Sequence, residues 1–303
     1  MTVPSAGSGR SASWSAVVVT YESGAALTEC VESLFADTSA EGPPDVVVVD
    51  NGSKDGSVAR LERRCPAARV VRPGANLGYA GGANRGIAAT STPVVAVCNS
   101  DLRIRAGTAA ALLARFDEPG VAAVGPRIRN PDGSTYPSAR IVPSPLDAAG
   151  HGLLGLVRPN NVFSARYRQL DVDPGLPRDV DWVSGAAIWL RRDALDAVGG
   201  WDDGYFMYVE DVDLCWRLGR AGWRIVYEPG GDVEHTQGLS TDARPYRMIV
   251  EHHRSLLRFA AKRWRGPKRL LLGPAAVYLA FRTMFAMFIR AARPRSEKPS
   301  VKG

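Results

Sequence analysis

Continuous hydrophobic runs of strand length alternate with segments of helical spacing over the first hundred residues. The runs are rich in valine and apolar at successive positions, which indicates strands that are buried on both faces. This alternation is typical of a parallel sheet covered by helices on both sides, so the pattern predicts an α/β fold. The expected strands span residues 14–21, 45–49, 69–72 and 93–98, and the expected helices span residues 25–35, 57–64 and 79–89.

The pattern becomes less regular after residue 121. Residues 126–145 are rich in Pro and Arg, and residues 160–178 are expected to be irregular. We expect this half to extend the same sheet rather than to form an independent domain. The expected strands span residues 121–125, 180–191, 223–227 and 231–234, and the expected helices span residues 143–157, 192–198 and 211–221, the last ended by Gly222.

The C-terminal part combines helical spacing with basic clusters. Residues 246–264 are expected to form a helix, and residues 270–289 are apolar apart from Gly273, Pro274 and Arg282. This length is close to that of a membrane span, but an Arg near the middle of a span is costly. An interfacial helix flanked by basic clusters therefore fits better, and a helix packed on the protein itself is the alternative.

These changes along the chain predict its domain organisation. Residues 1–13 are expected to be a disordered leader, because they are rich in Ser and Gly and lack the apolar stretch of a signal peptide. The main domain is expected over residues 14–242, with two halves that meet near residue 125. Residues 243–303 would form a helical, basic extension.

The net charge indicates which kind of partner the protein binds, and the cysteine content indicates the cellular compartment. The 303 residues carry a formal net charge of +7, and much of the basic excess lies after Arg244. Nucleic acid is not expected as a partner, because basic and aromatic residues are not interleaved on a sheet face; an anionic membrane surface is expected instead. The four cysteines lie far apart with no metal-ligand spacing, which predicts reduced thiols in a cytosolic protein.

An acidic stretch at the start of a predicted helix is the first candidate for chemistry. Glu210, Asp211 and Asp213 lie within four positions, next to aromatic and apolar residues that normally avoid them. Carboxylates at a helix N-terminus are favoured by the backbone dipole, so an acidic cap is one interpretation. Three carboxylates exceed what a cap needs, and a carboxylate at the edge of a cleft is what a general base requires.

Polar residues follow three of the predicted strands, at the sheet edge where ligands of parallel sheets bind. A carboxylate such as Asp50 at a strand exit can accept from a ribose hydroxyl or a pyrimidine imide, although Asp-Asn-Gly is also a common turn. Asp101 offers oxygen ligands for Mg²⁺ or Mn²⁺, and His235 could complete that site, the alternative being an ordinary surface histidine. The three groups are Thr20-Tyr21-Glu22, Asp50-Asn51 and Asn99-Ser100-Asp101.

A glycine-dense segment over residues 76–86 opens a predicted helix. Its glycines allow either close packing of the helix on the sheet or close approach of backbone N–H groups to a diphosphate. Its candidate contacts are Asn76, Gly78, Gly82 and Asn84.

Taken in order, these motifs resemble the inverting glycosyltransferases of family 2, which have the GT-A fold. The resemblance covers residues 15–235, and its rhamnosyltransferase branch is suggested by Y-P-S-A-R at residues 136–140 and D-W-V-S-G at residues 181–185. Asn99 stands where the family has the first Asp of its D-x-D motif. The other motifs that carry the resemblance are T-Y-E, V-V-D-N-G-S, N-L-G-Y-A-G-G-A-N-R-G, W-V-S-G-A and G-G-W-D-D, followed by Y-F-M-Y-V-E-D-V-D-L.

The resemblance implies a role for each motif residue. Asp211 would be the catalytic base, Glu210 would orient the acceptor, and Asp101 and His235 would bind the metal. The pockets for the sugar and the acceptor would be shaped by Trp182, Ser184 and Gly185. The donor nucleotide would be bound by Thr20, Tyr21, Glu22, Asp50, Asn51, Asn76, Gly78, Gly82, Asn84, Asn99 and Ser100.

The resemblance also implies a Rossmann-like sugar-nucleotide transferase with a membrane-associating C-terminal extension. The enzyme would use Mg²⁺ or Mn²⁺ to move L-rhamnose from dTDP-rhamnose to polyprenyl-diphosphate-linked N-acetylglucosamine, at the cytoplasmic face of the cell membrane. This reaction makes the linker between peptidoglycan and arabinogalactan. The alternatives are another donor or acceptor, a nucleotidyltransferase, or a non-catalytic saccharide- or lipid-binding module. A nucleotidyltransferase would need a cation in a loop after the first strand, which residues 21–24 do not offer.

Overall fold

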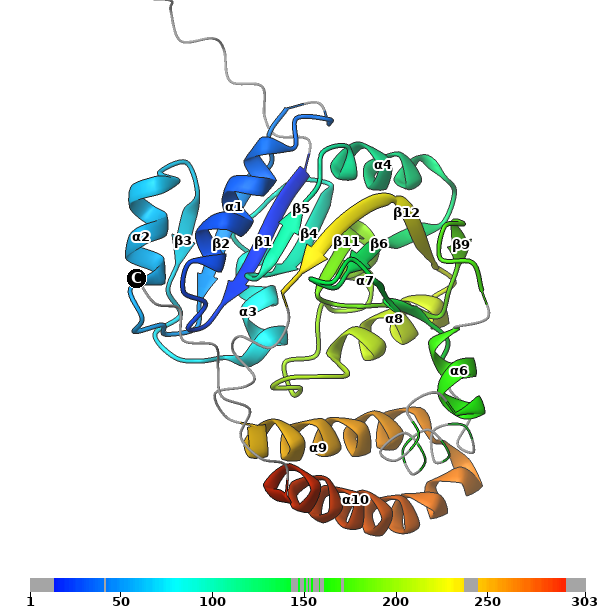
Figure 1. The fold of residues 1–303 in the computed structure, drawn as a ribbon. Coiled ribbons are helices and arrows are strands. Elements are labelled where there is room, and N and C mark those ends of the chain that lie inside the picture. Colours follow the sequence, from blue (N-terminus) through cyan, green and yellow to red (C-terminus); the bar gives the residue numbers. More distant parts are fainter. Residues whose placement is uncertain are drawn as a thin grey trace, which may run out of the picture.

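A ten-stranded mixed sheet lies at the centre of the protein, with helices on both of its faces (Figure 1). The computed structural model describes residues 14–292, except 41, 143–146, 148–149, 151, 153, 155–157, 159–160, 170–171 and 237–244. The strand order is β3-β2-β1-β4-β11-β6-β12-β5, with β7 paired to β6 and β9 paired to β12. The strands are β1 (Trp14–Thr20), β2 (Asp45–Asp50), β3 (Arg69–Val71), β4 (Val94–Asn99), β5 (Leu102–Ile104), β6 (Val121–Arg129), β7 (Thr135–Tyr136), β9 (Arg178–Asp179), β11 (Ala187–Arg191) and β12 (Arg224–His235); β8 (Ala139–Arg140) and β10 (Trp182–Val183) form a separate pair.

The expected parallel sheet is correct only for part of the strands. β3, β2, β1 and β4 are parallel, and β12 is parallel to β6. β11 lies between β4 and β6 and runs antiparallel to both, while β5 is antiparallel to β12. The sheet is therefore mixed, because the chain of the second half re-enters it in the opposite direction at β11.

Both faces of the central strands are buried, as the valine-rich runs predict. Along β1, Val17 and Val19 belong to one apolar core, whereas Ala16 and Val18 belong to the other. Helices α1 (Ala26–Ala36), α2 (Ser57–Arg64) and α4 (Thr108–Ala114) contribute to the second core. Helices α3 (Gly78–Ile87), α7 (Arg192–Ala197) and α8 (Glu210–Arg220) contribute to the first.

Several elements differ from the expected boundaries. The segment expected to be irregular contains α6 (Val162–Arg168), which begins where the Asn161 side chain accepts from the N–H groups of Phe163 and Ser164. β5, α4 and the short 3₁₀ helix η1 (Arg115–Asp117) were not expected. The expected strands at 223–227 and 231–234 are one irregular strand, β12, and the expected strand at 180–191 is divided into β10 and β11. The helix expected over residues 143–157 falls largely outside the described residues.

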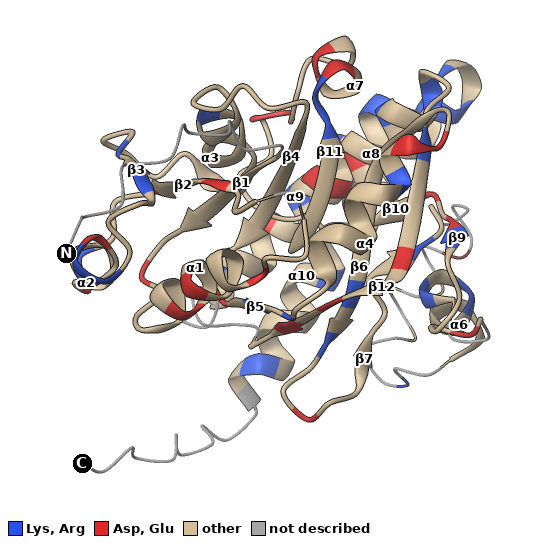
Figure 2. Cartoon of the chain, turned by 90° about the horizontal axis from the view of Figure 1, so that it is seen from above, with Lys and Arg blue, Asp and Glu red and all other residues tan. Residues whose placement is uncertain are grey.

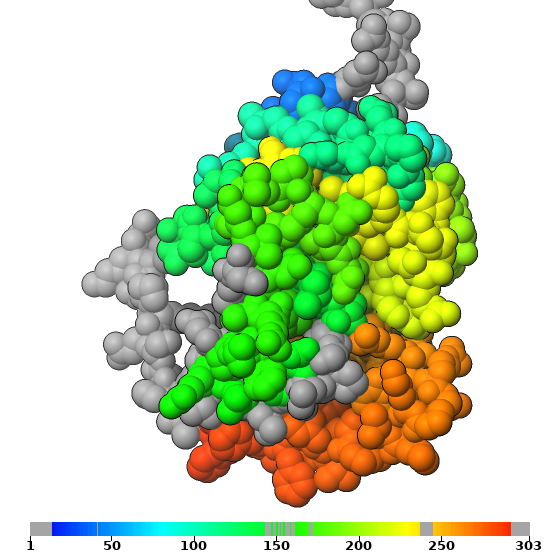
Figure 3. All heavy atoms as spheres, turned by 90° about the vertical axis from the view of Figure 1, so that its right-hand side faces the viewer, coloured from blue at the N-terminus to red at the C-terminus, as the bar shows by residue number. Residues whose placement is uncertain are grey.

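Two C-terminal helices pack as a hairpin beneath the sheet domain (Figures 1 and 3). α9 (Pro245–Arg263) faces the domain, and α10 (Leu272–Ala292) packs on α9 after the 3₁₀ helix η2 (Gly266–Leu271). Residues 266–291 are long and apolar enough to cross a membrane by length and composition, and none of their most apolar window is buried. The leader at residues 1–13 and the basic tail from residue 293 lie outside the described residues. All four cysteines are free and buried.

Candidate active site

A cleft of about 1520 Å³ lies between the sheet edge and the C-terminal hairpin. Its upper wall comes from the carboxyl ends of β1 and β4 and from the start of α8, while α9 and α10 form the opposite wall. A pocket for one small ligand typically has about 300–1,000 Å³, so this cleft has room for two substrates.

Most of the residues singled out in the sequence line this one cleft. The parallel strands bring their exits to the same edge, and α8 adds the acidic pair. The cleft is lined by Thr20, Tyr21, Glu22, Asn51, Asn76, Gly78, Asn99, Ser100, Asp101, Trp182, Ser184, Gly185, Glu210, Asp211 and His235.

Asp50, Gly82 and Asn84 do not line the cleft. The Asp50 carboxylate accepts from the N–H groups of Gly52 and Ser53, and so it shapes the turn after β2. A Cβ on Gly82 would lie 2.8 Å from Val19 Cγ1, which makes this glycine necessary for packing α3 on β1. The Asn84 amide donates to Trp201 O and accepts from its N–H, fixing the loop before α8. Of the two interpretations of the glycine-rich segment, close packing of the helix on the sheet therefore applies to Gly82.

The acidic pair is placed by an unusual stretch of backbone. Tyr208 and Val209 have φ of +69° and +70°, a left-handed conformation that is costly for a β-branched residue such as Val209. This bend starts α8 at Glu210 and directs Asp211 into the cleft. Asp211 Oδ2 accepts from the N–H of Gly185 at 2.8 Å, and Oδ1 accepts from the N–H of Val212 at 2.8 Å.

The two carboxyls differ in how strongly their surroundings oppose ionisation. Burial, and then the nearby charge of Asp211, raise the pKa of Glu210 well above its usual range. Burial also raises the pKa of Asp211, but the N–H groups of Gly185 and Val212 and the Arg140 guanidinium oppose that rise. Two adjacent buried carboxyls do not both ionise easily. Glu210 is therefore the member that is harder to ionise, and Asp211 is the member whose surroundings favour its ionised form.

Arg140 lies in an aromatic box beside Asp211, and sequence reasoning gave it no role. Its guanidinium carbon is 5.4, 5.3 and 4.9 Å from the ring centres of Tyr136, Tyr167 and Trp182. It donates to Tyr136 Oη at 2.8 Å, and among the described residues no carboxylate forms an ion pair with it. The signal in the sequence was Y-P-S-A-R, which carried the resemblance but had no assigned chemistry. Arg140 is thus a fixed positive charge that favours the ionised form of Asp211.

Arg140→Met is expected to move the acidic limb of the pH–activity profile to higher pH. If Asp211 is the base, the limb reports its protonation, and the Arg140 charge lowers the pKa of Asp211 while burial raises it. The measurement is kcat/KM against pH. Arg178→Met is the matched control, because Arg178 also stacks on a tyrosine, 4.7 Å from the Tyr227 ring centre, away from the cleft. An unmoved limb in Arg140→Met would show that this charge does not act on the base.

Asp101 and His235 meet in the same cleft, beside Asn99, whose N–H donates to the O of Ala186, the residue after Gly185. His235, at the end of β12, pairs with Leu102 of β5, and its Nε2 lies 3.0 Å from Asp101 Oδ1 and 3.2 Å from Asn99 Nδ2. One ring nitrogen cannot both donate to the carboxylate and accept from the amide, so one of these contacts is unsatisfied. A divalent cation bound by Nε2 and Oδ1 would satisfy both of these atoms at once, and an imidazole–carboxylate pair suits Mn²⁺. Among the described residues no three His, Cys, Asp or Glu side chains form a metal-binding group, so substrate oxygens would have to complete the coordination.

Comparison with known proteins agrees with this geometry. The family model for glycosyl transferase family 2 matches residues 15–199. The N-acetylglucosaminyl-diphospho-decaprenol L-rhamnosyltransferase of Mycobacterium tuberculosis H37Rv is 39% identical over 302 residues, which cover 94% of this chain and 96% of that protein.

Solved structures show the same fold at low sequence identity. Mannosyltransferase PcManGT from Pyrobaculum calidifontis, in complex with GDP-Man and Mn²⁺, has a TM-score of 0.53 at 17% identity, over 94% of this chain and 76% of that one. TarS from S. aureus has a TM-score of 0.52 at 16% identity, over 95% of this chain and 46% of that one. The fold is that of the GT-A glycosyltransferases.

Proposed function

Because the chain belongs to glycosyl transferase family 2, we propose that it transfers L-rhamnose from dTDP-β-L-rhamnose to N-acetylglucosaminyl-diphospho-polyprenol. The observation that carries this proposal is the 39% identity to the Mycobacterium tuberculosis rhamnosyltransferase over nearly the full length of both chains. The size of the cleft is consistent with a donor and an acceptor bound together. The product would be an α-1,3-linked rhamnosyl lipid for cell-wall linker synthesis.

Asp211 acts as the general base in this proposal. Its carboxylate takes the proton of the acceptor hydroxyl while the oxygen forms a bond to the anomeric carbon of rhamnose. The bond from that carbon to the diphosphate breaks on the opposite face, and dTDP leaves with the electron pair. A single displacement of this kind inverts the anomeric centre and needs no covalent nucleophile. Glu210, in the neutral form that burial favours, can donate a hydrogen bond to the acceptor.

The strand exits of the same cleft would hold the donor and a divalent cation. Asp101 and His235 would hold a divalent cation, with Asn99 beside them. When bound, such an ion stabilises the negative charge of the departing diphosphate. The acceptor contacts are Trp182, Ser184 and Gly185, and the donor nucleotide contacts are Thr20, Tyr21, Glu22, Asn51, Asn76, Gly78, Asn99 and Ser100, with Asp50 behind them at the end of β2.

The test is transfer from radiolabelled dTDP-rhamnose to a short-chain polyprenyl-diphospho-N-acetylglucosamine, with Mg²⁺, with Mn²⁺ and with a chelator. We expect metal-dependent formation of a rhamnosyl lipid. Formation of product with the chelator present would contradict the metal role of Asp101 and His235. Binding of dTDP without transfer would keep the nucleotide site and contradict the proposed sugar or acceptor, which a panel of other nucleotide sugars would then identify.

We further propose that the protein lies on the anionic cytoplasmic face of the cell membrane through α10. Phe281, Phe285 and Phe288 share one face of this helix and are 64, 46 and 69% exposed. Basic residues occur just before α10 and near its end (Figure 2). An apolar face flanked by basic residues is typical of a helix in the membrane interface.

Phe281→Ser combined with Phe288→Ser is expected to weaken vesicle binding by at least about 100-fold, since burying one Phe contributes about 1.5–3 kcal/mol. Co-sedimentation with vesicles containing anionic lipid measures this change. Leu176→Ser is the control, because Leu176 is 58% exposed but lies far from α10 in the sequence. Removal of all residues after Arg269 should have the same effect. Sedimentation equal to that of the wild type in either variant would exclude α10 as the membrane contact.

A further inference from the structure

The C-terminal hairpin forms a wall of the active-site cleft as well as an exposed surface. On α10, Ala275, Tyr278, Leu279 and Arg282 line the cleft, at the spacing of a single helix face. Phe281, only two positions from Leu279, lies on the exposed face. α10 therefore separates the outer surface from the cleft by the thickness of one helix.

The inner face of this hairpin begins next to the catalytic residues. Ser255 Oγ of α9 donates to Met207 O at 3.0 Å, and the rings of His252 and Tyr208 lie 5.3 Å apart. Tyr208 stands two residues before Glu210. Further along α9, the cleft wall is apolar and includes Leu256, Phe259 and Ala260. An acceptor whose sugar reaches Asp211 would thus have its other end against α9 and α10.

Arg282 is a cation held on this inner face, and no carboxylate of the described part of the chain forms an ion pair with it. Its Nε donates to Gly152 O at 3.0 Å, and its Nη1 donates to His253 Nε2 at 2.6 Å. His253 Nδ1 in turn lies 2.6 Å from Ile249 O, which fixes the tautomer that accepts from Arg282. Burial lowers the pKa of His253, so this imidazole is neutral and adds no competing charge. Among the described residues, the other three N–H donors of the guanidinium have no partner.

We propose that the inner face of the α9–α10 hairpin binds the diphosphate and first isoprene units of the polyprenyl-diphosphate acceptor, with Arg282 on the diphosphate. This rests on the proposed function, since it places the acceptor of that reaction. Leu256, Phe259 and Leu279 provide the apolar wall for the prenyl chain. The guanidinium offers a planar set of donors that matches phosphate oxygens.

Charge and position favour this occupant over a soluble saccharide. A saccharide acceptor has neither an anionic group for Arg282 nor an apolar chain for Leu279. A prenyl diphosphate has both an anionic group and an apolar chain. Its diphosphate would meet Arg282 and the prenyl chain that follows would meet Leu279. Because the outer face of α10 carries the exposed phenylalanines, a membrane-resident chain would reach the inner face without crossing bulk water.

The test compares Arg282→Gln, Arg282→Lys and Leu279→Ser in the full-length, detergent-solubilised protein. Arg282→Gln should raise the KM for the prenylated acceptor about 10- to 100-fold and leave the KM for dTDP-rhamnose unchanged, because hydrogen bonds to charged groups contribute about 1.5–3 kcal/mol. Arg282→Lys should restore part of the affinity. Leu279→Ser should raise the acceptor KM more for longer prenyl chains. Arg254→Gln is the matched control, because Arg254 lies on α9 with its side chain 75% exposed and does not line the cleft.

Binding of farnesyl diphosphate separates this subsite from the transfer reaction. It carries the diphosphate and three isoprene units but no sugar, so we expect it to bind the wild type, to bind Arg282→Gln at least about tenfold more weakly, and to compete with the acceptor but not with the donor. Unchanged binding in Arg282→Gln and Leu279→Ser, with both variants folded by thermal melting, would overturn the subsite even if the wild type makes the rhamnosyl lipid. Arg282-dependent binding with no rhamnosyl product would instead overturn the proposed transfer and leave the subsite standing.

Discussion

Asp211→Asn is expected to lower kcat for sugar transfer by about 10²- to 10⁴-fold, the usual contribution of a positioned general base. An amide keeps the shape of the side chain and its hydrogen bond to one of the N–H groups of Gly185 and Val212, but it cannot take the proton of the acceptor. Donor binding should change little, because the donor contacts lie at the strand exits. The measurements are the rate of rhamnosyl-lipid formation and the affinity for dTDP.

The matched variants are Glu210→Gln and Asp203→Asn. Burial raises the pKa of Glu210 and so favours its neutral form, which Gln resembles, and we expect a much smaller loss of kcat than in Asp211→Asn. Asp203 is an exposed carboxylate in the loop before α8 and should have no effect. An equal loss of activity in Glu210→Gln and Asp211→Asn would contradict this assignment. It would mean that the reaction also needs the ionised carboxylate of Glu210.

The stability of Asp211→Asn should distinguish a catalytic role from a structural one. Folding raises the pKa of Asp211, so the stability that this carboxyl contributes is present at low pH and is lost as pH rises through its folded-state pKa. At neutral pH the ionised side chain therefore costs stability, and a neutral Asn removes that cost. We expect a thermal midpoint equal to or above that of the wild type, despite the loss of activity.

The strands and their polar exits could be predicted from the sequence because they depend on local patterns. Runs of valine give buried strands, and the convergence of strand exits follows from their parallel order. β11 could not be predicted in its orientation, because its direction depends on how the second half re-enters the sheet. The bend at Tyr208 and Val209 was also missed, since neither residue favours a left-handed backbone in isolation.

The interpretation of the C-terminal apolar segment as a helix packed on the protein describes the inner face of α10, whereas the interfacial interpretation stays a proposal for its outer face. Arg282 was the signal that the helix is not uniformly apolar, and it lies on the inner face, bonded to Gly152 and His253. The outer face is exposed. The sequence pattern can distinguish the face of α10 that carries Arg282 from the apolar outer face. It cannot show that the inner face borders the cleft, because this depends on how α9 packs on the loop at residues 207–208.

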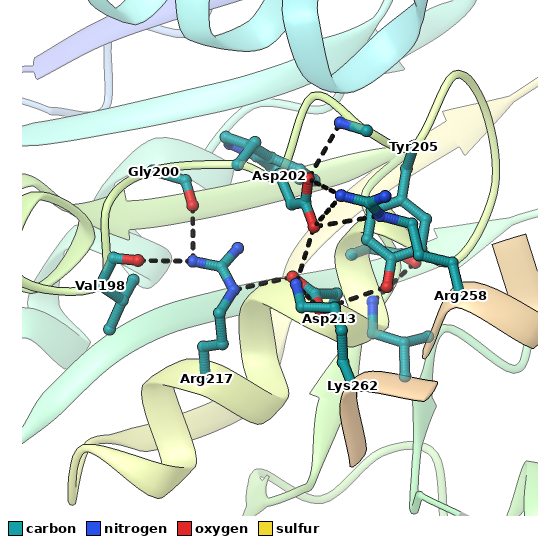
Figure 4. Close-up of polar contacts among 12 residues, drawn as sticks. Val198, Gly200, Asp202, Tyr205, Asp213, Arg217, Arg258 and Lys262 are labelled. Carbon is teal, nitrogen blue, oxygen red and sulfur yellow. Dashed lines mark hydrogen bonds and ion pairs between the residues drawn. The ribbon is translucent and has the colours of Figure 1, made fainter. Parts of the chain in front are cut away.

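The three carboxylates of the acidic stretch serve two different purposes. Residues two apart on a helix point in different directions, so Asp211 and Asp213 could not both face the cleft. Asp213 is fully buried on the other side of α8, where its carboxylate lies 2.7 Å from Arg217 Nε and 2.5 Å from Lys262 Nζ (Figure 4). Tyr205 Oη also donates to it at 3.3 Å.

This ion cluster joins the hairpin to α8. Lys262 of α9 contacts Asp202 as well as Asp213, and Arg258 of α9 donates to Asp202 (Figure 4). Burial raises the pKa of Asp202, but the hydrogen bonds from Arg258, Lys262 and the Gly204 N–H outweigh it, so the net effect is a pKa well below the usual range. Asp202 therefore remains ionised at neutral pH, and its ion pairs with Arg258 and Lys262 hold α9 against the loop before α8.

Asp213→Asn is expected to lower the free energy of unfolding by about 3–5 kcal/mol, because it leaves the largely buried Arg217 without its carboxylate and leaves Lys262 with Asp202 alone. For a domain of this size the thermal midpoint should fall by roughly 6–20 °C. Glu32→Gln is the control, since Glu32 and its partner Arg64 are 41 and 66% exposed and their pair should contribute no measurable change.

Thermal melting and kcat at low temperature, measured together, test the division of roles on α8. Asp213→Asn should melt early yet keep most of its kcat while folded, whereas Asp211→Asn should melt normally and be inactive. A stable but inactive Asp213→Asn variant would place Asp213 in the chemistry and contradict this division.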